Sequence, residues 1–260
     1  ITKKTKAIIV LHYAGYPCEI TKDLLDVCKK HNINIIEDVA HAPGAEINNK
    51  KCGTIGDYGC FSFFSNKNIS AGEGGIIVAR DEEAIKKLKL LRSHGMTAIS
   101  LDRITGRSSD YDVLESGFNY RLDEIRSALV IEQLKKLNKA NKMRAKNVNF
   151  YKDLLKDTEI IFPFSENNNN KVSAHHILPI LLPKRVNRSK MISFLKSEGI
   201  QTSIHYPAFW SFSKYKNIFN SDNFPICSEV SERELTLPLY PSMDKNDVAL
   251  VCNALKRFLK

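Results

Sequence analysis

The stretch from Asp57 to Gly75, DYGCFSFFSNKNISAGEGG, constrains this chain more than any other. A short apolar run ends near the hydroxyl of Ser62, Lys67 follows between two asparagines, and a glycine-rich turn leads into a second apolar run, Ile76–Val78. This pattern predicts two buried strands with a single lysine just beyond the first, where ligands of open α/β sheets bind. A partly buried lysine loses its proton easily and can form a Schiff base with a carbonyl compound. A solvated loop lysine would fit the same letters.

Composition narrows the classes of protein that this chain can be. Its 260 residues, 43% of them hydrophobic, are enough for one large domain or two smaller ones with a substantial core. The formal charge of +10 would favour acidic partners, including phosphorylated small molecules. The lysines are scattered, and no basic block alternates with aromatic residues, so we do not expect nucleic-acid binding. No segment has the length of a membrane span, so we expect no membrane partner.

The six cysteines form no CxxC pair and have no zinc-like spacing with histidine. We therefore expect reduced thiols in a cytoplasmic protein and no metal site. The chain begins at Ile1 with no signal peptide and runs almost directly into an apolar strand. From this start we expect the chain to be a fragment with material missing ahead of it.

The first half of the chain has the pattern of an α/β domain. A strand at 7–12, a helix at 20–30 with Thr21 as its N-cap, and a strand at 34–37 form a βαβ unit, which predicts a parallel sheet. Strands near Phe61 and Ile77 extend this sheet, and a helix follows at 81–93, capped by Asp81.

The second half changes character after a long helical stretch. We expect a helix at 122–155 with a break near 138–141, and then a linker that holds Pro163 and an asparagine run. Beyond it the sequence predicts strands at 175–182 and 200–206 and helices at 189–198 and 244–259. The fold class is therefore α/β, with a large domain at 1–140 and a smaller α+β domain at 141–260.

Four further residues could share chemistry with Lys67. Asp38 ends an apolar strand at the carboxyl edge of the sheet, where a carboxylate could pair with a protonated ring nitrogen. His41 could contact the same ring, and the Ser62 hydroxyl could bind a phosphate. Asn119 precedes a helix. Each has a structural alternative: a turn aspartate, a structural histidine, a serine bonded to backbone, and a helix N-cap.

Taken together and in order, these motifs resemble a known family. The segments are EDVAHAPGAE, CFSFFSNKNISAGEGG, LRSHG and GFNYRLDEIRSAL, with HYAGYP before them and IHYPAF and LTLPLYPSM after them. This order is similar to that of the DegT/DnrJ/StrS family of sugar-nucleotide aminotransferases, and the similarity covers essentially the whole chain. The resemblance implies the fold of type I pyridoxal-phosphate enzymes, with a mainly parallel central sheet and a smaller α+β C-terminal domain.

The resemblance also implies roles for the candidate residues. Lys67 matches the lysine that binds pyridoxal 5'-phosphate covalently and then moves the proton. Asp38 matches the partner of the pyridine nitrogen, Ser62 a phosphate ligand, and His41 a residue near the ring. Asn119 matches a residue that reaches across a homodimer interface to the cofactor phosphate of the partner subunit.

The implied reaction moves an amino group from glutamate, which becomes 2-oxoglutarate, to a keto sugar on a nucleoside diphosphate. Such a reaction serves amino-sugar biosynthesis for surface polysaccharides or glycoconjugates. His205 and Tyr206 match a segment on the substrate side of the site. Glycines 72, 74 and 75 would let the backbone turn tightly behind Lys67.

Several alternatives remain open at the level of sequence. A dehydratase branch of the same family has histidine in place of the lysine, so Lys67 argues against it. A catalytically inactive binding or regulatory protein on the same fold has no chemical need to keep Lys67, Asp38 and Ser62 together. A lyase that uses the same cofactor is a third possibility. Family members begin well upstream of Ile1, so we expect the N-terminal part of the large domain to be absent.

Overall fold

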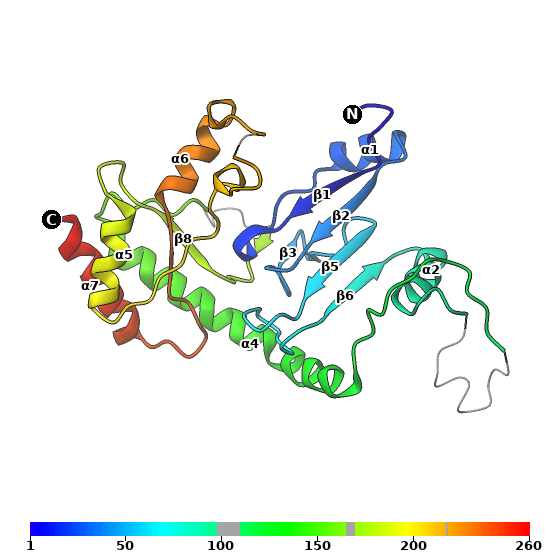
Figure 1. The fold of residues 1–260 in the computed structure, drawn as a ribbon. Coiled ribbons are helices and arrows are strands. Elements are labelled where there is room, and N and C mark those ends of the chain that lie inside the picture. Colours follow the sequence, from blue (N-terminus) through cyan, green and yellow to red (C-terminus); the bar gives the residue numbers. More distant parts are fainter. Residues whose placement is uncertain (98–109, 165–169, 217) are drawn as a thin grey trace.

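The computed structural model describes residues 1–97, 110–164, 170–216 and 218–260. An N-terminal sheet with its helices and a C-terminal half lie toward opposite ends of the long helix α4, which joins them (Figure 1). The elements of the first half are β1 (Ala7–Leu11), η1 (Tyr13–Gly15), α1 (Lys22–Lys30), β2 (Asn34–Asp38), β3 (Glu46–Ile47), β4 (Lys50–Lys51), β5 (Tyr58–Ser62), β6 (Gly75–Ala79) and α2 (Glu82–Arg92). Those that follow are α4 (Glu124–Leu155), β7 (Lys171–Val172), β8 (Leu178–Leu181), α5 (Arg188–Ser197), η2 (Phe209–Ser211), η3 (Ser221–Asn223), α6 (Pro225–Arg233), β9 (Glu234–Leu237) and α7 (Lys245–Leu259).

The main sheet has the strand order β1-β2-β5-β6 and is mixed but mostly parallel. β1 and β2 pair in parallel through α1, as the βαβ pattern predicts, and β2 pairs in parallel with β5. β6 pairs antiparallel to β5, because the connection between them is a loop that turns straight back without a crossover helix. The predicted caps Thr21 and Asp81 are confirmed: each accepts backbone N–H bonds at its helix start.

The two faces of this sheet differ in how well they are covered. One face packs on α1 and a buried cluster that includes Val10, Ile35 and Cys28. The register aligns Leu11 with Asp38, Asp38 with Cys60, and Cys60 with Ile77, so these side chains share the other face. There Leu11 is 47% exposed and Ile77 is 52% exposed. The face that carries Asp38 is therefore apolar and open.

The C-terminal half has a closed core. β8 and β9 form an antiparallel pair that packs with α5, α7 and the end of α4. Leu195, Leu235 and Leu255 are fully buried in this cluster. Asp244 caps α7 with a reciprocal capping box, which confirms the predicted start of that helix.

Helix α4 differs from the sequence analysis in two ways: it has no break, and it runs through the expected domain boundary. The expected break near residues 138–141 is wrong, since Glu124–Leu155 is one helix of 32 residues. The amide of Asn141 donates to the carbonyl of Pro43, 3.0 Å away, so its polar group is used in tertiary contact and does not compete with the helix backbone. The domain boundary expected at residue 140 lies inside this helix.

The structure differs from the sequence analysis at three other places: one predicted strand is wrong, one alternative role is excluded, and two elements were not predicted. Residues 200–206 form no strand and contribute an isolated bridge between Ser203 and Thr236. The N-cap of α4 is Asp123, whose carboxylate accepts from the backbone of Arg126, so Asn119 does not cap it. Helix α6 and strand β9 were not predicted, because Pro225 at the helix start and the short apolar run after it resemble a loop. No helix in the described ranges is both long and apolar enough to cross a membrane.

Candidate active site

The loop that carries Lys67, residues 63–74, is closed by its own backbone. Phe63 N–H donates to the Gly74 carbonyl at 2.8 Å, and Ala71 N–H donates to the Phe63 carbonyl at 2.9 Å. Gly74 has a φ of 137°, which glycine adopts readily and residues with a Cβ rarely do. A Cβ there would also lie 2.8 Å from the Leu122 side chain. The turn therefore needs glycine at this position, as expected from the sequence.

Asn68, next to Lys67, fixes the loop to the rest of the molecule. Its buried amide donates to Asn141 Oδ1 and to the Ala174 carbonyl, both at 2.9 Å. Because the nitrogen donates, its oxygen is the acceptor toward His176 Nδ1, also at 2.9 Å. The position of Lys67 is thereby tied to α4 and to the segment that leads into β8.

Lys67 and Asp38 lie in one electrostatic neighbourhood. Lys67 is partly buried, and this burial lowers the pKa of its amine, while the negative charge of Asp38 partly opposes the shift. Asp38 lies at the end of β2, where its Oδ1 accepts from the backbone of Ala40 at 3.0 Å. Its other oxygen has no hydrogen bond among the described residues. The pair thus combines an amine that loses its proton more easily than usual with an available carboxylate.

His41 is buried beside this pair in a defined protonation state. Ala14 N–H donates to His41 Nδ1 at 3.3 Å, so the proton of the neutral ring lies on Nε2, facing the Tyr206 hydroxyl 3.3 Å away. Burial lowers the pKa of His41 to about 4, helped by the positive charges of Lys67 and His205. The imidazole is therefore neutral near pH 7 and serves as a hydrogen-bond donor.

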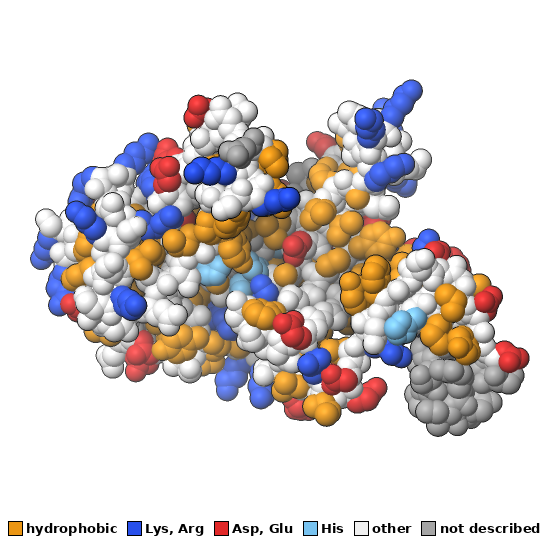
Figure 2. Space-filling view, viewed as in Figure 1, with side chains coloured by type: hydrophobic (Ala, Val, Ile, Leu, Met, Phe, Trp, Pro, Cys, Tyr) orange, Lys and Arg blue, Asp and Glu red, His pale blue; other side chains and the backbone are white. Residues whose placement is uncertain are grey.

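The C-terminal half contributes further polar groups to the same place. The rings of His41 and His176 lie 4.4 Å apart, and Tyr206 reaches His41 from the 203–208 segment. Tyr13 donates from η1 to the His205 carbonyl, joining the two halves of the chain. Figure 2 shows histidine atoms in a hollow between the sheet and the C-terminal half. We call Lys67, Asp38, His41, His176, His205 and Tyr206 the Lys67 cluster.

The other two predicted site residues, Ser62 and Asn119, lie in different environments. Ser62 ends β5 on the face that carries Asp38, and its hydroxyl accepts weakly from Phe64 N–H at 3.3 Å. Asn119 is exposed and accepts from Arg121 Nε at 3.0 Å. Within the described residues, no hydrogen bond or ion pair joins Asn119 to the Lys67 cluster. Ser62 thus lies at the expected sheet edge, while Asn119 lies apart.

A second buried cluster lies inside the sheet half, where the ligand atoms of His12, Glu37 and Cys52 lie within 4.8 Å of one another. Burial would raise the pKa of Glu37, but hydrogen bonds from His12 and from the backbone N–H groups of residues 53, 55 and 56 hold it below its usual value. His12 Nδ1 in turn accepts from Cys18 N–H at 3.0 Å. The lone pairs that a metal would need are therefore already used, and this cluster shapes the interior of the fold.

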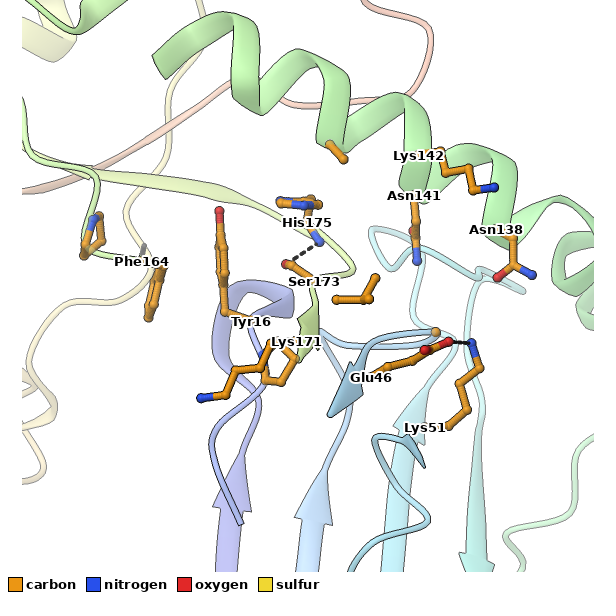
Figure 3. Close-up of a pocket in the computed structure, with 15 residues that line it drawn as sticks. Tyr16, Glu46, Lys51, Asn138, Asn141, Lys142, Phe164, Lys171, Ser173 and His175 are labelled. Atoms are coloured by element: carbon orange, nitrogen blue, oxygen red, sulfur yellow. Dashed lines mark hydrogen bonds and ion pairs between the residues drawn. The ribbon is translucent and has the colours of Figure 1, made fainter. Parts of the chain in front are cut away.

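A cavity of about 680 Å³ lies on the far side of the His175–His176 segment (Figure 3). Tyr16 stacks on Phe164 at 4.5 Å along one wall, and Asn141 and Lys142 of α4 form another. Lys51 pairs with Glu46 at its floor. None of the five predicted site residues lines this cavity, so it is separate from the Lys67 cluster.

Sequence reasoning missed several members of the site. Asn68 and His176 make their key contacts with partners about a hundred residues away, and no local spacing signals this. Tyr13 lies in the HYAGYP segment. The position of this segment in the chain contributed to the family resemblance, but the sequence did not indicate a role for the tyrosine. Glu234 and Thr236 lie in β9, which was not predicted.

Comparison with known proteins gives a consistent result. The model of the DegT/DnrJ/EryC1/StrS aminotransferase family matches residues 1–256. The chain is 37% identical to the uncharacterized protein MJ1066 of Methanocaldococcus jannaschii and 32% identical to the spore coat polysaccharide biosynthesis protein SpsC of Bacillus subtilis. Both matches cover all of this chain and 68% of the relative.

Solved structures agree with these relatives. PseC of Helicobacter pylori, an aminotransferase involved in the biosynthesis of pseudoaminic acid, superposes with a TM-score of 0.86 at 30% identity. That match covers 100% of this chain and 68% of PseC. The chain belongs to the DegT/DnrJ/EryC1/StrS aminotransferase family, and it spans about two thirds of the length of these relatives.

Proposed function

We propose that this family member is a pyridoxal-phosphate-dependent aminotransferase that moves an amino group from glutamate to a keto sugar carried on a nucleoside diphosphate. The observation that carries the proposal is the placement of Lys67. Its amine is partly buried, its pKa is lowered, and it lies in the electrostatic neighbourhood of Asp38. The family uses pyridoxal phosphate, and its solved structures include a form with that cofactor.

The residues of the Lys67 cluster fit this cofactor chemically. An amine whose pKa is depressed by burial is a better nucleophile toward an aldehyde at neutral pH than a solvated lysine. Among the residues that the structure describes, no donor reaches the second carboxylate oxygen of Asp38, as a partner of a protonated ring nitrogen requires. The Ser62 hydroxyl, at the end of the next strand, can donate to a phosphate. When bound, the cofactor supplies an electron sink for the carbon that loses its proton.

The protein groups have separate tasks in this proposal. Lys67 would hold the cofactor, and its amine, whose pKa is lowered by burial, would take and return the proton. Asp38 holds the positive charge of the ring nitrogen in place. His41 stays neutral at the pH of the reaction, so it can lie beside the ring without adding a charge that competes with Lys67.

The substrate and the assembly belong to the same proposal. PseC and SpsC are named for the biosynthesis of pseudoaminic acid and of spore coat polysaccharide, which supports an amino-sugar product for a surface glycoconjugate. The net charge of +10 suits a diphosphate. Asn119, exposed and separate from the Lys67 cluster, would act across a homodimer interface. We place the enzyme in the cytoplasm, where nucleotide sugars are made.

An absorption spectrum tests the proposal directly. Protein supplied with pyridoxal phosphate should show a yellow band that bleaches when glutamate is added and returns with 2-oxoglutarate. Lys67→Ala should lack the protein-bound band. Lys89→Ala, at an exposed lysine of α2, should retain it and serves as the matched control.

Other spectra would favour other functions. A band that glutamate leaves unchanged would point to a lyase or a different donor. Bleaching with glutamate, but no amine transfer to any nucleoside-diphosphate keto sugar, would overturn the substrate class and keep the aminotransferase. No band in folded protein with excess cofactor would overturn the proposal and favour the inactive binding protein.

A further inference from the structure

Two buried residues of β9, Glu234 and Thr236, form hydrogen bonds with His205, and neither was predicted as a site residue. Glu234 is 3% exposed and Thr236 is 5% exposed. The Thr236 hydroxyl donates to Glu234 Oε1 at 2.5 Å and lies 2.9 Å from His205 Nδ1. The second carboxylate oxygen of Glu234 accepts from the backbone N–H of His205 at 2.9 Å. These three residues form a short, continuous hydrogen-bond chain.

The direction of this chain follows from its ends. The His205 backbone can only donate, so Glu234 Oε2 is an acceptor. The other oxygen, Oε1, accepts from the Thr236 hydroxyl. Burial raises the pKa of Glu234, while the hydrogen bonds from Thr236 and His205 and the positive charge of Arg188 oppose that rise and favour the carboxylate. A hydroxyl carries one proton, so Thr236 Oγ1 must be the acceptor toward His205 Nδ1. The neutral imidazole then carries its proton on Nδ1 and leaves the lone pair on Nε2.

The backbone around His205 is held just as firmly. Ser203 and Thr236 exchange two backbone hydrogen bonds, at 3.1 and 2.8 Å, which fasten the 203–208 segment to β9. Tyr13 donates from η1 to the His205 carbonyl. Burial, reinforced by the negative charge of Glu234, raises the pKa of this phenol, so it remains a donor. The ring of His205 is therefore fixed at its backbone and at Nδ1.

Nε2 of His205 is the remaining free atom of the ring. It has no hydrogen bond among the described residues, and it is not one of the buried unpaired atoms, so solvent reaches it. Burial lowers the pKa of His205, and the positive charge of Lys67 lowers it further. The imidazole is thus neutral near pH 7, and its accessible lone pair lies within the electrostatic reach of Lys67.

We propose that Glu234 and Thr236 are positioning residues that fix the tautomer of His205 and present its Nε2 as a hydrogen-bond acceptor beside Lys67. The acceptor would bind a donor group of the substrate, a sugar hydroxyl or an ammonium group. This use of the acceptor rests on the proposed function, whereas the tautomer itself does not.

The tautomer is measurable in the free protein. Long-range ¹H–¹⁵N NMR of the seven histidines, with His205 assigned by its loss in His205→Gln, distinguishes a protonated Nδ1 from a protonated Nε2. At pH 7 we expect the Nδ1–H form in about tenfold excess, the preference that one buried hydrogen bond of ordinary strength provides. An excess of the Nε2–H form in the unmodified protein would overturn the proposal.

The variants make opposite predictions. In Glu234→Gln the amide oxygen is retained by the His205 backbone N–H, so the amide nitrogen faces Thr236 and donates to its hydroxyl. Thr236 then donates to His205 Nδ1, and the tautomer should reverse to Nε2–H. Thr236→Ser keeps the hydroxyl and should keep the original tautomer, while Thr236→Val should remove the preference. Unchanged spectra in both Glu234→Gln and Thr236→Val would refute the chain.

A kinetic comparison links the tautomer to the substrate. With an active sugar substrate, Glu234→Gln should raise KM for the sugar or lower kcat about tenfold, whereas Thr236→Ser should leave both near their unmodified values. If NMR shows the tautomer reversal but the absorption test on Lys67 fails, the positioning role stands and the proposed function falls. If the tautomer does not reverse while glutamate still bleaches the cofactor, the positioning role falls and the proposed function stands.

Discussion

The two halves of this molecule differ in how completely their apolar side chains are buried. In the C-terminal half, Leu235 and Leu255 are fully buried within a cluster of strands and helices. In the sheet half, Ile9 is 68% exposed and Ile77 is 52% exposed on the face that also carries Asp38. The difference teaches that the two halves contribute unequally to the stability of the fold, although both supply residues to the Lys67 cluster. The closed half supplies cohesion, whereas the open half presents Lys67, Asp38 and Ser62 at the edge of an incompletely covered sheet.

The largest expected effect comes from opening the closed half. Leu255→Ala on α7 removes a side chain with no exposed surface, and we expect a loss of about 2–5 kcal/mol in the free energy of unfolding. Leu250→Ala on the same helix removes the same atoms from a position that is 56% exposed, and should cost less than about 1 kcal/mol. Urea denaturation followed by circular dichroism measures both. Equal losses would mean that the C-terminal core is not closed as described.

An intermediate effect is expected where the halves meet. Burial lowers the pKa of His41 to about 4 and that of His176 still further below its usual value. Below about pH 6.5 these histidines bind protons in the unfolded chain but not in the folded chain. Their contribution to stability should therefore fall as the pH decreases from about 6.5 to 4, and it should be constant above about pH 6.5. Each histidine contributes a slope of up to about 1.4 kcal/mol per pH unit.

The histidine contribution is isolated by substitution. Unfolding free energies at pH 7, 6, 5 and 4.5 should show a shallower slope in His41→Gln than in the unmodified protein. His31→Gln, at the exposed end of α1, should leave the slope unchanged. Parallel slopes in all three proteins would show that His41 is not buried in its neutral form.

The smallest expected effect is on the open face. Ile77→Thr replaces an exposed apolar side chain with a β-branched polar one, so stability should change by no more than about 0.5 kcal/mol. Binding of a hydrophobic dye should nevertheless decrease, because the substitution removes apolar surface from the open face that also carries Leu11 and Ile9. A loss of several kcal/mol would contradict the comparison and show that this face is covered.

Local patterns were sufficient for much of the fold. The strand, lysine, glycine and strand order around Lys67 predicted the β5–loop–β6 unit because its conformation depends on nearby residues, above all Gly74. The caps at Thr21 and Asp81 were readable for the same reason, since each bonds within its own first turn.

What the sequence did not reveal depends on contacts between distant segments. Asn68 bonds to Ala174, 106 residues away, and Tyr13 bonds to His205 across 192 residues. The sequence predicts a helix break near residues 138–141 because nothing local shows that the amide of Asn141 bonds to Pro43. A hydroxyl such as that of Thr236 in a short apolar strand has no local feature that distinguishes a functional group from a buried structural one.

Helix α4 has a consequence for how the protein can be divided. Its 32 residues extend about 48 Å, and they carry Leu137 against the Lys67 loop and Tyr151 into the C-terminal core. A cut at residue 140 would sever the helix one residue before Asn141, which holds Asn68 and hence the position of Lys67. Neither half would keep the position of Lys67 if it were produced separately, so grafting or shuffling of segments should leave helix α4 uncut.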